Sequence, residues 1–144
     1  KLMCVNCAET YPPEMLYSCN KCDGILEVYY EQNDLRGKSN VATRSMSESI
    51  GDIRLGYQLS LHEGGTPLHH SERYKKVLHG FQGEVYFKNE TVNPTGSFKD
   101  RLISAAISKA KEFGYDKIVC ASSGNAGASA AAYAAKSGIE AVII

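Results

Sequence analysis

Residues 117–144, KIVCASSGNAGASAAAYAAKSGIEAVII, contain the pattern that decides the fold. Lys117 to Ala121 and Glu140 to Ile144 are short runs rich in β-branched and apolar residues, so both are predicted strands. Between them, the alanine-rich segment Ala126 to Lys136 predicts a helix, which Gly138 closes. A strand, a helix and a second strand in this order predict a parallel pair with a right-handed crossover.

The preceding residues continue this alternation of strand and helix. Glu84 to Lys88 is a third predicted strand. A second predicted helix follows and ends at Gly114, since apolar residues recur there at helical spacing: Phe98, Leu102, Ala105, Ala106, Ile107, Ala110 and Phe113. The fold class is therefore α/β with a parallel sheet, and we expect the three strands to share that sheet, in an order that the sequence does not reveal.

The chain divides into three predicted regions by composition. Residues 1–30 carry four of the five cysteines, and strand-like runs at Tyr17-Ser18 and at Ile25 to Tyr30 surround the second cysteine pair. Residues 31–62 are polar and form a predicted connector with a short helix over Met46 to Ile53. Residues 63–144 form the predicted α/β part.

Charge and composition exclude several classes of partner. Sixteen basic and sixteen acidic residues cancel, so the chain lacks the basic surface that nucleic acid or an anionic membrane selects. No apolar run approaches the roughly 20 residues needed to span a bilayer. The first residues also lack a signal-peptide pattern, so a cytoplasmic protein with a small-molecule partner is expected.

Four cysteines have the spacing of a metal site. Cys4 and Cys7 form one C-x2-C pair, and Cys19 and Cys22 form a second pair after an eleven-residue gap. Two such pairs place four thiolates about 2.3 Å from one zinc ion and close a structural tetrahedral site. Thirty residues cannot build a sizeable core, whereas bound zinc contributes roughly 10 to 16 kcal/mol. Ala8 stands where a turn-favouring glycine is frequent, so strain is expected there.

Two alternatives for this cysteine region stay open. Two disulfides would explain the same four cysteines in a secreted fragment. A zinc ribbon can also bind nucleic acid or another protein. Residues 1–30 contain only two basic residues, Lys1 and Lys21, against four acidic ones, and this excess of negative charge disfavours phosphate contacts.

The segment Asn93 to Arg101, NPTGSFKDR, presents a lysine at a helix start. Pro94 and Gly96 form a predicted turn, and Ser97 with Asp100 is spaced as a capping box that begins the helix at Phe98. Lys99 then lies in the first turn, where the helix dipole disfavours a cation by roughly 0.3 to 1 kcal/mol. Such a position favours the neutral amine that attacks aldehydes. The alternative is an exposed lysine paired with Asp100 or Glu90.

The segment Ser122 to Gly127, SSGNAG, joins a predicted strand to a predicted helix. Hydroxyls, glycines and the N-H groups of a helix start converge there, which is typical of an anion-binding site. Physical reasoning leaves open whether the anion is a carboxylate or a phosphate. An ordinary capped helix start is the alternative.

Asn93 to Arg101 and Ala121 to Ile139 resemble the lysine signature and the asparagine loop of fold-type II pyridoxal-phosphate enzymes, the group containing threonine synthase, threonine dehydratase and the tryptophan synthase β subunit. The resemblance implies a three-layer αβα fold like that of the tryptophan synthase β subunit, and a Schiff base between Lys99 and pyridoxal 5'-phosphate. It also implies that Asn125 faces the cofactor's ring hydroxyl, and that the substrate is bound by Ser122, Ser123, Gly124, Asn125 and Ala126.

Glu63 to Leu68, EGGTPL, resembles the turn that opens the catalytic fold in this family, and we interpret it as architectural. Together with the cysteine pairs, this layout is most similar to that of threonine synthases. These enzymes convert O-phospho-L-homoserine and water into L-threonine and phosphate, so a phosphorylated amino acid is the implied substrate and a homodimer of the full-length enzyme is expected. Cysteate synthase or another fold-type II lyase is the enzymatic alternative, and a non-catalytic zinc-ribbon interaction module is the alternative of another class.

The family also needs a glycine-rich loop for the cofactor phosphate and a polar partner for the pyridine nitrogen. Neither falls within these residues, so we expect a truncated chain that binds the cofactor weakly and turns over no substrate.

Overall fold

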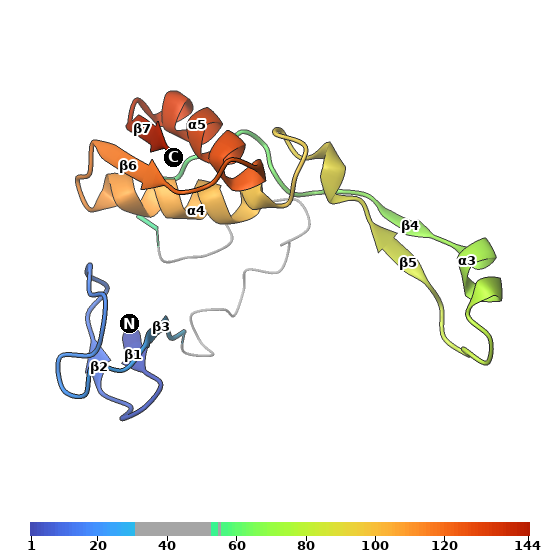
Figure 1. Ribbon diagram of the computed structural model, residues 1–144, viewed down its shortest axis with the longest axis horizontal. Helices are drawn as coiled ribbons and strands as arrows, with labels where there is room; N and C mark the ends of the chain where they lie inside the picture. The colour runs from blue at the N-terminus through green and yellow to red at the C-terminus, as the bar shows by residue number, and fades with distance from the viewer. Residues whose placement is uncertain (31–52, 55) are drawn as a thin grey trace. The chain divides into compact units, whose positions relative to one another are not determined.

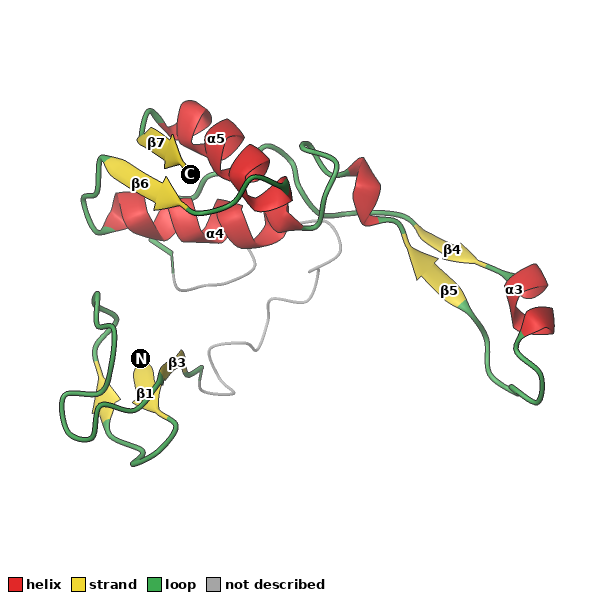
Figure 2. Cartoon of the chain, in the orientation of Figure 1, coloured by secondary structure: helices red, strands yellow, loops and turns green. Residues whose placement is uncertain are grey.

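The computed structural model describes residues 1–30, 53–54 and 56–144, which fall into two compact units, Lys1–Ser39 and Asn40–Ile144 (Figure 1). The helix predicted over Met46 to Ile53 lies outside the described residues except for its last position. Each unit is described by itself below, and Figure 2 marks the helices and strands of both.

The first unit is built on a small antiparallel sheet. Its central strand β1 (Leu2–Cys4) pairs with β2 (Thr10–Tyr11) on one side and with β3 (Leu26–Val28) on the other. The strand predicted from Ile25 to Tyr30 is therefore present in shortened form. The strand predicted at Tyr17-Ser18 is wrong, because these residues form a bend and both edges of β1 already have partners.

The second unit contains the predicted parallel pair of strands. Strands β6 (Lys117–Cys120) and β7 (Glu140–Ile143) pair in parallel, and α5 (Asn125–Ser137) forms the crossover between them. Gly138 ends α5 in a left-handed conformation with φ of 75°, which a glycine adopts without a steric penalty. The strand-helix-strand prediction is confirmed here.

A second helix, α4 (Lys99–Glu112), packs beside α5 (Figure 1). Together with the sheet, these two helices bury a small apolar core formed by Leu59, Ile107, Tyr133, Ala134 and Ile139. Ile118 and Ala141 of the sheet pack against this core, whereas Val119, the next residue along β6, is 65% exposed. Among the described residues, β6 and β7 thus have one face covered by helices. The third layer of the expected αβα arrangement stays a prediction.

The buried face of α4 differs from the predicted one. Phe98 and Leu102, which the apolar pattern placed in the core, are 55% and 62% exposed. The helix instead buries Asp100, Ser104, Ile107 and Ser108, which are separated by four, three and one residues. The helical period was predicted correctly, but the buried face is mostly polar because its side chains form hydrogen bonds, as described below.

A hairpin precedes α4 and corrects the predicted sheet. Strand β4 (Leu68–His70) pairs antiparallel with β5 (Tyr86–Lys88), and the short helix α3 (Glu72–Val77) lies between them. A 3-10 turn, η1 (Glu90–Val92), then leads toward α4. The predicted third strand exists as β5, but the expectation that it shares a sheet with β6 and β7 is wrong, because among the described residues β5 pairs with β4 in a sheet of its own.

None of the helices in the described part of the chain has the length and apolar character needed to cross a membrane.

Candidate active site and metal centre

The two helices that carry the predicted site segments begin on the same side of the helix pair, the side nearer the hairpin (Figure 1). Helix α4 begins at Lys99, and α5 begins at Asn125. Asp100 in the first turn of α4 accepts a hydrogen bond of 2.6 Å from the hydroxyl of Ser129 in α5. The lysine segment and the Ser122 to Gly127 loop are thus joined by a direct contact between their helices.

The turn before α4 departs from the predicted capping box. Gly96 has φ of 79°, and the Ser97 hydroxyl accepts a 3.0 Å bond from the backbone N-H of Lys99 rather than from that of Asp100, so the predicted capping box does not form. The carboxylate of Asp100 instead accepts a 2.7 Å bond from the backbone N-H of Thr95. The helix begins at Lys99, one residue later than predicted, with Phe98 as its N-cap.

The Lys99 side chain is half-buried, and its Nζ lies 4.6 Å from the centroid of the Phe98 ring. This distance is typical of a cation-π contact. The two carboxylates that were alternative partners for Lys99 bind other groups, since Asp100 binds Thr95 and Ser129, and Glu90 binds Arg101. The structure therefore places the amine beside an aromatic ring, and the carboxylates of Asp100 and Glu90 are engaged by other donors.

The loop from Ser122 to Gly127 lies against the start of α5. A Cβ atom at Gly127 would lie 2.2 Å from the backbone oxygen of Ser122 and 3.0 Å from a methyl carbon of Ile143, so only glycine permits this close approach. Gly124 is the N-cap of α5 and no side chain caps this helix start. The N-H groups at the start of α5 therefore keep the hydrogen-bonding capacity that an anion requires.

The predicted substrate-binding residues around this helix start are all accessible. Ser123, Gly124 and Asn125 are exposed, while Ser122 and Ala126 are half-buried. The structure thus brings the five residues together at one helix end, and their contacts to substrate or cofactor stay predictions.

A polar network joins the EGGTPL turn to the lysine segment. Glu90 accepts bonds from Arg101 Nε at 2.7 Å, Thr66 Oγ1 at 2.6 Å and Asn93 Nδ2 at 2.9 Å. The Arg101 guanidinium is the main cause that lowers the pKa of Glu90 to about 2. Asn93 also accepts a 3.0 Å bond from the backbone N-H of Gly64. These contacts agree with an architectural role for the turn.

Glu63 at the start of that turn is a second buried carboxylate, only 2% exposed. Its Oε2 atom accepts bonds from the Tyr133 hydroxyl at 2.8 Å, the Leu61 backbone N-H at 3.0 Å and the Ser60 hydroxyl at 3.0 Å. Burial, followed by the nearby carboxylate, raises the pKa of Tyr133. The Oε1 atom of Glu63 is buried without a hydrogen-bond partner among the described residues.

The sequence reasoning missed these polar contacts. It considered Glu90 only as an alternative partner of Lys99, and it did not single out Tyr133 or Ser129, whose partners lie 70 and 29 residues away along the chain. A weak signal was present, because Asp100, Ser104 and Ser108 share one face of α4 at helical spacing.

The four paired cysteines of the first unit converge on one point. Their Sγ atoms all lie within 4.8 Å of one another, with Cys4 and Cys22 separated by 3.5 Å and Cys7 and Cys19 by 3.6 Å. Four thiolates at about 2.3 Å from a central zinc would be about 3.8 Å apart, whereas a disulfide needs about 2.05 Å. The geometry and the soft sulfur donors therefore fit zinc, and the cysteines are not joined as disulfides.

Contacts around the cluster shift two of the thiols in opposite directions, and the contact with Cys7 is the main cause that raises the pKa of Cys22 to about 12. The Tyr11 hydroxyl lies 3.1 Å from Cys19 Sγ, and this contact is the main cause that lowers the pKa of Cys19 to about 6. The backbone N-H of Asn6 donates to Cys4 Sγ at 3.4 Å. Ala8 has φ of 57°, so the strain that the sequence predicted at this turn is confirmed.

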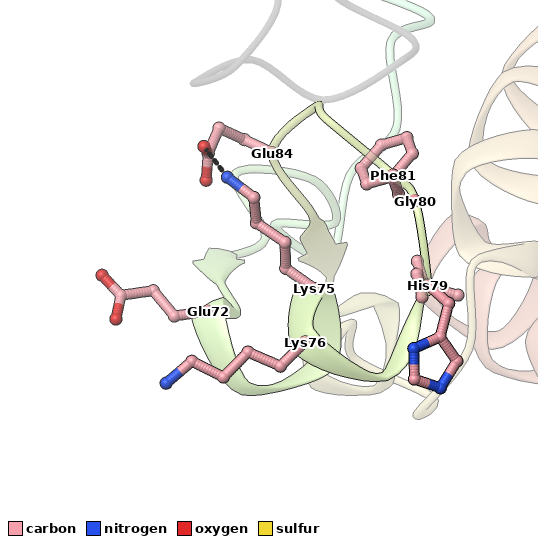
Figure 3. Close-up of a pocket in the computed structure, with 8 residues that line it drawn as sticks. Glu72, Lys75, Lys76, His79, Gly80, Phe81 and Glu84 are labelled. Carbon is pink, nitrogen blue, oxygen red and sulfur yellow. Dashed lines mark hydrogen bonds and ion pairs between the residues drawn. The ribbon is translucent and has the colours of Figure 1, made fainter.

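A shallow cavity of about 500 Å³ lies at the hairpin that contains α3, and none of the predicted site residues lines it (Figure 3). Its walls mix Lys75, Lys76 and His79 with Glu72 and Glu84, and Lys75 donates to Glu84 at 2.5 Å. Because basic and acidic side chains are mixed in its walls, this cavity offers no concentrated charge of one sign for a ligand, and we assign it no function.

Comparison with known proteins adds independent information. Residues 59–144 match the family model described as "Pyridoxal-phosphate dependent enzyme". The threonine synthase of Methanocaldococcus jannaschii is 39% identical over 98% of this chain and 36% of its own length. That of Methanosarcina acetivorans is 36% identical over 99% of this chain and 36% of its own length. The threonine synthase of a Bacillus species is 52% identical over 60% of this chain and 24% of its own length. The chain thus spans about a third of the two archaeal relatives.

Proposed function

Because the chain belongs to the family of pyridoxal-phosphate-dependent enzymes, we propose that it forms the lysine-bearing part of a threonine synthase. The proposed reaction converts O-phospho-L-homoserine and water into L-threonine and phosphate. Three relatives named threonine synthase, 36% to 52% identical, support this choice, and the two archaeal alignments include the region of the four cysteines.

The observation that carries the proposal is the pairing of two helix starts. Lys99 lies in the first turn of α4, the N-H groups at the start of α5 have no side-chain cap, and the bond between Asp100 and Ser129 joins the two helices. An amine for an aldehyde and an anion-binding helix start are two of the groups that an amino-acid substrate on this cofactor requires.

The residues present fit pyridoxal phosphate at this place. When bound, the cofactor supplies an electron-withdrawing ring that favours loss of a proton from the substrate Cα. Lys99 holds the cofactor through its amine and, when released, moves protons at that carbon. The N-H groups and hydroxyls of Ser122, Ser123, Gly124 and Ala126 hold the substrate carboxylate, and Asn125 faces the ring hydroxyl of the cofactor.

The cysteine unit has a separate, structural role in this proposal. Cys4, Cys7, Cys19 and Cys22 bind one zinc ion through four thiolates, which leaves no open position for a water or a substrate. The zinc therefore stabilises residues around the small sheet and takes no part in the reaction.

Trapping of the cofactor tests the lysine assignment. The chain is incubated with pyridoxal phosphate and reduced with borohydride, and the modified lysines are identified by peptide mass spectrometry. We expect modification to concentrate on Lys99, to be lost in Lys99→Ala and to persist in the matched control Lys109→Ala, which removes a half-buried lysine further along the same helix. Modification spread evenly over the lysines would contradict the assignment.

The substrate is tested in the full-length protein. Phosphate release from O-phospho-L-homoserine, with formation of L-threonine, is the expected result. Turnover of O-phosphoserine with sulfite instead would favour a cysteate synthase, and a colourless protein without turnover of either compound would favour a non-catalytic module.

A further inference from the structure

We propose that Asp100 is a positioning residue that holds the turn bearing Lys99 in a fixed place against α5, and that Ser129 is its anchor. This inference rests on the proposed function, since it concerns how the Lys99 amine is presented to a cofactor. Asp100 and Ser129 would act through the Lys99 turn, and their side chains need not touch cofactor or substrate.

The contacts of Asp100 account for both of its carboxylate oxygens. Oδ2 accepts the backbone N-H of Thr95 at 2.7 Å, and Oδ1 accepts the hydroxyls of Thr95 and Ser129 at 2.5 and 2.6 Å. The residue is 0% exposed, so these donors replace the water that the carboxylate loses on burial. Hydrogen bonds to a buried carboxylate are short and strong, and each fixes a direction as well as a distance.

The position of these contacts connects them to the site. Asp100 follows Lys99 directly, and its two bonds to Thr95 close the turn that contains Gly96 and Ser97. Ser129 lies one helical turn after Asn125, on the same face of α5. The Asp100 carboxylate therefore fixes the turn before Lys99 through its bonds to Thr95. Through its bond to the Ser129 hydroxyl, it also fixes this turn against α5, the helix that follows the anion-binding loop.

A second buried serine provides a matched control. Ser108 on α4 is also 0% exposed, accepts a bond of 2.9 Å from the Leu59 backbone N-H and donates a bond of 2.6 Å to the Ser104 carbonyl. Its loss should weaken the fold about as much as the loss of Ser129, because each removes one hydroxyl from a buried tertiary contact. Ser108 lies more than two helical turns from Lys99, so its loss should leave the amine in place.

The experiment compares cofactor trapping in Ser129→Ala, Asp100→Asn and Ser108→Ala with that in the unchanged chain. All four proteins are reduced with borohydride at a temperature at which circular dichroism shows each to be folded. The readouts are the rate of trapping at Lys99 and the share of trapped cofactor found there. We expect Ser129→Ala and Asp100→Asn to lower the rate at Lys99 about tenfold, because small misplacements of a reacting group have effects of this order or larger. Ser108→Ala should trap as the unchanged chain does.

Two results with the variants would overturn the inference and leave the proposed function standing. An unchanged rate and share at Lys99 in folded Ser129→Ala would show that the bridge does not position the amine. An equal loss in Ser108→Ala would show a general effect of stability. If Asp100→Asn does not fold, Thr95→Val replaces it, since this variant removes one hydroxyl donor to the same carboxylate. Absence of preferential trapping at Lys99 in the unchanged chain would instead refute the proposed function, and the inference with it.

Discussion

The cysteine unit and the α/β unit maintain their folds by different means. Within residues 1–30, the buried residues are Cys4, Cys19 and Gly24, and a Cβ atom at Gly24 would lie 2.9 Å from the Cys4 sulfur. The α/β unit instead buries an apolar cluster around Ile107 and Tyr133, with hydrogen-bonded carboxylates beside it. One unit thus has an interior of cysteine sulfurs, and the other has an interior of apolar packing and paired charges. Each should respond to a different perturbation.

Metal removal should have the largest effect, and only on the cysteine unit. Bound zinc contributes roughly 10 to 16 kcal/mol to small domains of this kind. We therefore expect a chelator, or Cys19→Ser, to unfold the first unit while the helical circular dichroism of α4 and α5 persists. Amide NMR signals of residues 1–30 measure the loss, and zinc content should be about one ion per chain.

Cys120 provides the control for that experiment. It is a half-buried cysteine of β6 outside the four-cysteine cluster, so Cys120→Ser should leave the zinc content unchanged. A metal-free chain that keeps dispersed amide signals for residues 1–30 would show that the cysteine unit does not need zinc to fold.

Tyr133→Phe should have the next largest effect, on the α/β unit alone. The change removes the 2.8 Å bond to Glu63, whose other oxygen is already buried without a partner. Loss of a donor to a buried carboxylate costs about 2 kcal/mol. Denaturant unfolding measures this difference in the free energy of unfolding. Tyr115→Phe, at a tyrosine that is 45% exposed, should change it little.

Acid should weaken the α/β unit through Glu90. Its pKa is about 2 in the folded protein, mainly because of Arg101, and higher in the unfolded chain, so the unfolded state takes up a proton first as the pH falls. The contribution of this pair, on the order of 1 kcal/mol, is thus complete above about pH 4.5 and is lost toward pH 2.

Thermal unfolding across this range measures the effect of acid on stability. Glu90→Gln should be less stable at neutral pH and should lose less stability as the pH falls through this window. An unchanged pH profile in Glu90→Gln would contradict the assignment.

Ala8→Gly should have the smallest effect, and of opposite sign. Ala8 has φ of 57°, a left-handed conformation that costs alanine about 1 kcal/mol and glycine almost nothing. Part of this gain is offset because glycine has more freedom in the unfolded chain, so about 0.5 kcal/mol of added stability remains. Competition with a chelator measures it as tighter zinc retention, and weaker retention would show that this turn is not strained.

The features predicted correctly from sequence are those encoded over a few adjacent residues. The two C-x2-C pairs predict a four-sulfur cluster because each pair is a local turn, and Gly138 predicts the end of α5 because it alone tolerates the conformation there. The lysine segment was placed correctly at a helix start for the same reason. Its roles in binding cofactor and substrate stay predictions.

The features that the sequence did not reveal depend on distant partners. Strand β4 contains two histidines between turn residues, and only its pairing with β5 makes it a strand. From the helical pattern alone, Asp100 is classed as an exposed, polar position. Its donor Ser129 lies 29 residues away along the chain, so the local sequence does not reveal the contact that buries it. Hydropathy ranks such a residue as a surface residue, whereas hydrogen bonding places it in the interior.

The pairing of β4 with β5 has a consequence for how the protein can be labelled. The Pro67 carbonyl accepts a 2.9 Å bond from the Asn89 N-H at the base of the hairpin. This bond holds the chain entering the hairpin and the chain leaving it side by side. At the tip, an atom added to Gly80 would meet nothing within 4 Å. Doubling the length of a flexible loop costs only about 0.6 kcal/mol. A fluorophore or an affinity tag inserted at Gly80 should therefore report on the protein without displacing the segments that lead to Glu63 and Lys99.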